Sequence, residues 1–81
     1  MMKFIMYVKE SNMMEEVKIT AENEEEALYI CIDEKLQLIK GIKYVNDLRK
    51  ELYNEFEKFV NKLETSNRVI LCKDVMVKKI P

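Results

Sequence analysis

The chain has 81 residues and a net charge of −1, with 36% charged side chains, no histidine and one glycine. These numbers exclude a second domain core, a glycine-rich phosphate loop and a zinc site with histidine ligands, and the side chain that most often serves as a general acid or base near neutral pH is missing. We therefore expect one domain, residues 1–81, that is not an enzyme and has no metal and no cofactor.

The first 21 residues predict a β-hairpin. Residues 3–9 alternate in character, with apolar side chains at the centre of both faces, which is typical of an interior strand. Ser11 and Asn12 supply turn residues. Residues 16–21 alternate more cleanly, with Val17, Ile19 and Ala21 on one side, and this pattern indicates a second, half-buried strand.

A helix is expected next, over residues 24–39. Asn23 can cap its start, Glu26 can reach back toward the amide of the cap, and Gly41 stands where a residue of positive φ would end it. Lys35 interrupts an otherwise apolar stripe, which consists of Ala27, Leu28, Cys31, Ile32, Leu36, Leu38 and Ile39. A second interpretation stays open, in which the helix ends near Glu34 and residues 35–39 pair with 42–45 as a hairpin.

The second helix is the clearest element of the sequence. Asn46 or Asp47 would cap its start, and residues 65–67 would end it. Its apolar side chains fall within an arc of about 140° at 100° per residue, and they are Leu48, Leu52, Tyr53, Phe56, Phe59, Val60 and Leu63.

The last segment predicts strand over residues 68–72 and 75–80. A hairpin and one long bent strand both stay open, because Lys73 and Asp74 make a poor two-residue turn. The resulting order, ββααβ(β), predicts an α+β fold in which two helices pack on one face of a small antiparallel sheet of three or four strands.

Charge is divided along the chain. Residues 1–34 hold nine acids and three lysines, a net charge of −6, whereas residues 35–81 hold eleven basic residues and six acids, a net charge of +5. Four of the glutamates gather where the first helix should start, although the helix dipole needs only one or two. We expect an acidic surface there that binds a basic surface of a partner protein, and it comprises Glu22, Glu24, Glu25, Glu26, Ile30, Asp33 and Glu34.

In size, richness in Lys, Ile, Asn and Glu, and lack of catalytic residues, the chain resembles the small proteins of phages and mobile elements that act by occupying the surface of a host protein, as anti-CRISPR proteins do. The resemblance is one of type and depends on no motif. It implies a non-enzymatic protein-binding module that inhibits a host defence protein.

Two alternatives stay open. The basic second half could bind nucleic acid through Lys40, Lys43, Arg49 and Lys50, although a net charge of −1 and few aromatic side chains weigh against this. The sheet face without helices could also form a homodimer, which we expect to have Ile5, Tyr7 and Ile70 in its interface.

The two cysteines and the lack of long apolar runs bear on the compartment. Cys31 and Cys72 lie 41 residues apart, so we expect buried free thiols. The longest uncharged apolar run, Ala27 to Ile32, is far shorter than the roughly 20 residues that span a bilayer, and the first residues do not resemble a signal peptide. We expect a cytoplasmic protein without membrane contact.

Overall fold

The N-terminal hairpin forms as its alternation predicts. In the computed structural model, which describes residues 1–39 and 42–81, β1 (Met2–Glu10) pairs with β2 (Met13–Ala21) in an antiparallel register. The turn residue Ser11 has a positive φ of 51°. The alternate side chains Phe4, Met6 and Val8 of β1 are fully buried, so one face of this hairpin forms part of the core.

The C-terminal segment is a hairpin and not one bent strand. β3 (Arg68–Cys72) pairs with β4 (Val75–Ile80), and β4 also pairs with β1. The sheet therefore has the order β2-β1-β4-β3, with β1 in its interior as expected. The β3–β4 ladder contains an irregularity between Ile70 and Cys72. The added twist of such a bulge accompanies the tight turn at Lys73 and Asp74.

The first helical segment covers residues 24–39, as predicted, but contains a π-helical turn. α1 (Glu24–Ile30) continues into η1 (Cys31–Lys35) and then α2 (Leu36–Ile39). The alternative hairpin over 35–45 is wrong, because residues 35–39 are helical and the next helix begins at Ile42. Gly41, the predicted end of the helix, lies outside the described residues.

One residue of the predicted apolar stripe is misplaced, among those whose side chains the structure describes, which do not include Ile39. Leu38 is 79% exposed, whereas Leu28, Ile32 and Leu36 are fully buried at intervals of four residues. Because Leu38 follows Leu36 by two residues, it lies about 200° further around the helix and faces away from the core.

The predicted second helix is two helices. α3 (Ile42–Asn54) and α4 (Phe56–Ser66) meet at Glu55, and α3 starts before the predicted caps at Asn46 and Asp47. A straight helix over residues 42–66 would be about 37 Å long at 1.5 Å per residue. The longest dimension of the Cα trace is 30 Å, so the bend keeps both halves against the core. The end is as predicted, with Asn67 in the left-handed conformation as the C-cap.

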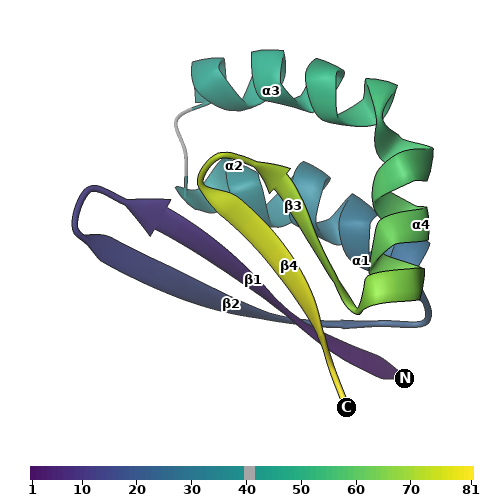
Figure 1. Ribbon diagram of the computed structural model, residues 1–81. Coiled ribbons are helices and arrows are strands. Elements are labelled where there is room, and N and C mark those ends of the chain that lie inside the picture. Colours follow the sequence, from purple (N-terminus) through teal and green to yellow (C-terminus); the bar gives the residue numbers. More distant parts are fainter. Residues whose placement is uncertain (40–41) are drawn as a thin grey trace.

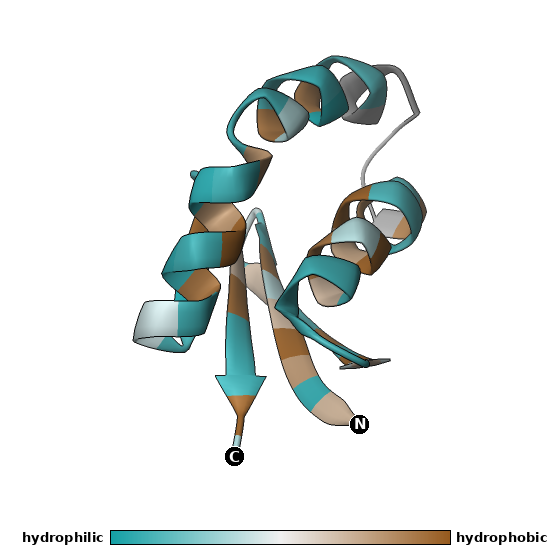
Figure 2. Cartoon of the chain, turned by 90° about the vertical axis from the view of Figure 1, so that its right-hand side faces the viewer, coloured by the Kyte–Doolittle hydropathy of each residue, from teal (hydrophilic) through white to brown (hydrophobic). Residues whose placement is uncertain are grey.

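The helices cover one face of the sheet (Figure 1). α1 contacts β2 and α4, α4 contacts β3 and β4, and α3 contacts η1 and α2. In the side view, α1 and α4 are the two helices next to the strands, and α3 lies farthest from the sheet (Figure 2). The fold is therefore α+β with a small antiparallel sheet, as the sequence predicts.

Two further observations concern the cysteines and the helix lengths. Both cysteines are free thiols, with Cys31 buried and Cys72, next to the bulge of β3, only half-buried. Desolvation raises the pKa of the Cys31 thiol to about 12 against the lowering effect of Lys35.

Within the described residues, no helix has the length and apolar character to cross a membrane.

Candidate binding surfaces

Two of the glutamates at the start of α1 have structural roles. The Asn23 side chain accepts a hydrogen bond from the backbone N–H of Glu26 at 2.8 Å, and the Glu26 carboxylate accepts one from the backbone N–H of Glu22 at 3.2 Å. The Glu26 carboxylate therefore accepts from the amide of Glu22, which is one residue before Asn23, the cap residue whose amide was the expected donor. These bonds satisfy backbone donors that a helix start leaves without partners.

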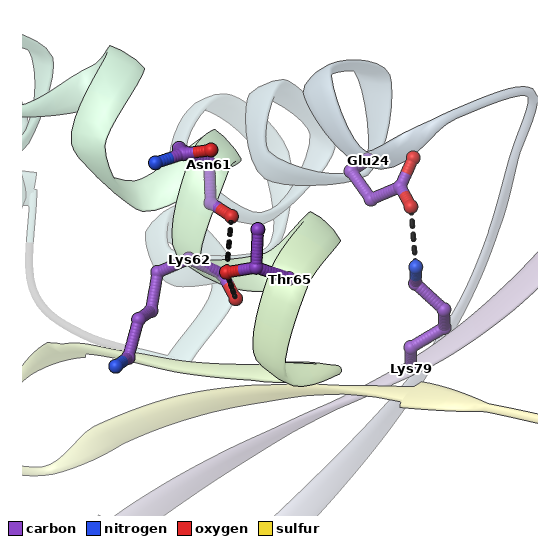
Figure 3. Close-up of polar contacts among 5 residues, drawn as sticks. All are labelled: Glu24, Asn61, Lys62, Thr65 and Lys79. Carbon is purple, nitrogen blue, oxygen red and sulfur yellow. Dashed lines mark hydrogen bonds and ion pairs between the residues drawn. The ribbon is translucent and has the colours of Figure 1, made fainter.

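The second structural glutamate is Glu24, which pairs with Lys79 and so joins α1 to β4 (Figure 3). The two side chains are only 12% and 19% exposed. The hydrogen bond from Lys79 lowers the pKa of the Glu24 carboxyl. Figure 3 also shows the Thr65 hydroxyl donating to the Asn61 carbonyl at 2.9 Å in the last turns of α4.

Asp33 also has an internal partner. Its Oδ1 lies 3.1 Å from Nη2 of Arg49, which joins η1 to α3. Burial and the neighbouring Asp33 carboxylate raise the pKa of the Tyr53 phenol. Glu24, Glu26 and Asp33 of the predicted acidic surface therefore have partners within the fold. The same holds for Arg49 of the predicted nucleic-acid set.

The other predicted residues are placed differently. Glu22, Glu25 and Glu34 are exposed. Ile30, which the sequence predicts as part of the acidic surface, is half-buried and packs against the core. The reason is that α1 contacts both the sheet and α4, so a wider arc of the helix is covered than its main stripe.

A groove between α1 and α4 brings one predicted glutamate together with two that the sequence analysis missed. We call it the acidic groove; its volume is about 230 Å³, and its lining is Glu25, Tyr29, Phe56, Glu57, Val60, Asn61 and Glu64. The rings of Tyr29 and Phe56 stack with a centroid distance of 4.4 Å, and Tyr29 is 42% exposed. The lining thus combines three carboxylates with aromatic rings and includes no basic residue.

The predicted dimer residues lie together on the sheet face that no helix covers, which we call the open face. Tyr7 is opposite Met76, which is opposite Ile70, so the three form a row across β1, β4 and β3. Ile70 is 66% exposed, and Ile5, Tyr7 and Met76 are half-buried. The strand register and the alternation of side chains also place charged residues on this face. One of them is the acid Glu16, and the other five are basic: Lys3, Lys9, Lys18, Arg68 and Lys78.

The basic residues of the open face are not neutralised within the fold. Lys78 is directly opposite Arg68, and Lys78 and Lys18 are both opposite Ile5, so one row across the sheet holds three cations. None of the five forms an ion pair with another residue of the described chain. The open face is therefore strongly positive.

The predicted nucleic-acid residues do not join this face. Lys40 lies outside the described residues, Lys43 lies in the first turn of α3, Arg49 pairs with Asp33, and Lys50 is exposed on α3. Over residues 1–39 and 42–81, no group of three or more His, Cys, Asp or Glu side chains is arranged to hold a metal ion. Comparisons of the sequence and the fold with known proteins found no matching family model, no similar curated protein and no similar solved structure.

Proposed function

We propose that the protein is a non-enzymatic protein-binding module whose acidic groove binds a basic segment of a partner protein. One observation supports this most directly: Glu25 of α1 and Glu57 of α4 lie beside the exposed ring of Tyr29, in a groove without a lining cation. A cation over an aromatic face gains about 0.5–1 kcal/mol at exposed sites. The carboxylates add ion pairs to the same group.

The size and chemistry of the groove favour an arginine side chain. Its volume of about 230 Å³ is below the roughly 300–1,000 Å³ of small-molecule pockets, but one long side chain fits. A planar guanidinium can stack on Tyr29 or Phe56 while it donates to a carboxylate in bidentate fashion, which an ammonium cannot do. The partner we propose therefore presents arginine on an otherwise basic surface.

The proposal includes inhibition. Proteins that act on nucleic acid, host defence nucleases among them, present basic surfaces to it. A small acidic module that occupies such a surface competes with the nucleic acid for it. This mode of action needs no catalytic residue and agrees with the resemblance to small phage proteins.

Affinity capture from the native host tests the proposal with matched variants. The groove variant is Glu25→Gln, Glu57→Gln and Glu64→Gln. The control variant removes three exposed acids outside the groove by Glu22→Gln, Glu34→Gln and Glu51→Gln. We expect the wild type and the control to capture the same basic protein. The groove variant should bind it about 3- to 150-fold more weakly, since the three lost carboxylates each remove an exposed ion pair of about 0.2–1 kcal/mol.

Unchanged capture by the groove variant would contradict the proposal, provided that circular dichroism shows all three proteins to be folded. A titration with a tetra-arginine peptide, followed by NMR, gives a direct measurement on the groove. The largest shifts should come from the ring protons of Tyr29 and Phe56. Shifts confined to other residues would assign the arginine-binding site elsewhere.

A further inference from the structure

We infer that the open face binds single-stranded nucleic acid. This is a second surface, formed by the strands and not by α1 and α4, and the inference does not depend on the acidic groove. The partner must be anionic, because five basic side chains and one glutamate surround the apolar centre of this face. Proteins that bind single strands without sequence preference combine a positively charged surface along the backbone with aromatic side chains on which bases stack.

The row of cations is the first argument. Like charges directly opposite each other in a sheet destabilise it, yet Lys78 and Arg68 are such a pair, and Lys18 lies in the same row. The protein forms ion pairs for other basic residues, Lys79 and Arg49 among them. The cations of the open face are left for an external anion with several charges.

The aromatic ring is the second argument. Tyr7 lies on the interior strand β1, two residues from Ile5 and two from Lys9, so the cationic row and Lys9 are each about 7 Å from it along the strand. Tyr7 lines a hollow of about 320 Å³. The other lining residues are Lys9, Met14, Ile70, Lys73, Asp74, Val75 and Met76. A base stacked on Tyr7 would bring its flanking phosphates to the lysines on either side.

Single-stranded nucleic acid fits this surface better than two other occupants. A duplex keeps its bases paired and stacked, so Tyr7 could not contact a base face. A second copy of the chain in a two-fold dimer would bring five basic residues against the same five, which is electrostatically unfavourable.

Fluorescence anisotropy with labelled 20-nucleotide oligothymidylate and oligouridylate tests the inference. Five phosphate contacts predict that log K falls with log salt with a slope of about −3.5, so binding should weaken about 100-fold between 50 and 200 mM salt. Lys18→Gln with Lys78→Gln should reduce the slope to about −2.1. Lys50→Gln removes an exposed lysine on α3 and should leave the slope unchanged.

Tyr7 variants separate stacking from charge. Tyr7→Leu keeps an apolar side chain and should weaken binding about tenfold, whereas Tyr7→Phe keeps the ring and should bind as the wild type does. Glu25→Gln with Glu57→Gln should bind the oligonucleotides normally, so failure of one proposal is distinguished from failure of the other.

Three results would overturn the inference. The first is no binding at 50 mM salt with protein concentrations up to about 50 µM. Non-specific binders have a Kd of about 1–100 µM at physiological salt, and a slope of about −3.5 tightens this about 50-fold at 50 mM salt, to about 2 µM or below. The second is equal affinity for a 20-base-pair duplex, which would remove the role of the bases. The third is equal affinity for polyglutamate, which would assign the open face to an acidic protein.

Discussion

Replacing Lys78 by glutamate should stabilise the fold while it weakens binding at the open face. Lys78 is directly opposite Arg68, and Lys18 lies two strands away in the same row. Two unit charges about 6 Å apart in water interact by about 0.7 kcal/mol, which screening at 0.15 M salt reduces to about 0.3 kcal/mol. Reversing the charge changes this interaction by about 0.65 kcal/mol, and the same estimate for Lys18 at about 10 Å adds about 0.25 kcal/mol.

The sum of about 0.9 kcal/mol corresponds to a rise in Tm of about 4–7 °C for a domain of this size. Thermal unfolding followed by circular dichroism measures it, and Lys78→Gln should give about half the rise. In 1 M salt, where the Debye length is about 3 Å, the gain from Lys78→Glu should fall to about 0.2 kcal/mol. A variant that is less stable than the wild type, or a gain that salt does not change, would refute the electrostatic account of this row.

Two further predictions concern groups with shifted pKa values. Because Lys79 lowers the pKa of Glu24 below its ordinary value of 4.5, the ion pair contributes stability above pH 4.5 that is lost as the pH falls through the folded-state pKa. Urea unfolding at pH values from 7 to 3 measures this. At pH 7, Glu24→Gln should be about 1–3 kcal/mol less stable than the wild type, since Lys79 loses its partner, and its free energy of unfolding should fall less on acidification. An equally steep fall in the variant would contradict this role of Glu24. Since burial raises the pKa of Cys31 to about 12, its thiol stays protonated at pH 8. Ellman's reagent should therefore label Cys72 first and Cys31 only on unfolding. Equally fast labelling of the two thiols would contradict the burial of Cys31.

The strands were predictable because their signal is local. Alternation over residues 3–9 and 16–21 places the buried and exposed side chains correctly, and the Ser11 turn needs no distant contact. The pairing of β4 with β1 joins segments more than sixty residues apart, and no local pattern specifies it. The sequence also could not decide between a hairpin and one bent strand at Lys73. The bulge that accompanies the turn depends on the pairing of β3 with β4, which no single segment encodes.

The helices show where periodicity is insufficient. The apolar arc of the second helix is continuous through Phe56, so nothing in the pattern marks the bend at Glu55. The bend follows from the size of the core, which a straight helix would overshoot. Within the first helix, the half-buried Lys35 belongs to the π-helical turn, and the interruption that it makes in the stripe was the available sign of an irregular turn.

The candidate sites were predictable only in part, because each combines distant segments. Glu25 was expected on an acidic surface, but Glu57 and Glu64 join it only through the packing of α1 against α4. Ile5, Tyr7 and Ile70 were expected on one open face, and the register confirms that they share it. The lysines beside them could have been found from the same alternation, which puts Lys3 and Lys9 on the side of Ile5 and Tyr7.

The polarity of the molecule runs between its layers and not between the halves of its chain. Residues 22–67, which include the helices, hold eleven acids and seven basic residues, whereas the strand segments 1–21 and 68–81 hold seven basic residues and four acids. A homodimer through Ile5, Tyr7 and Ile70 therefore stays a prediction that charge opposes. The acidic layer of one molecule complements the open face of another, so any self-association driven by this polarity should be head to tail and should weaken as salt shortens the Debye length.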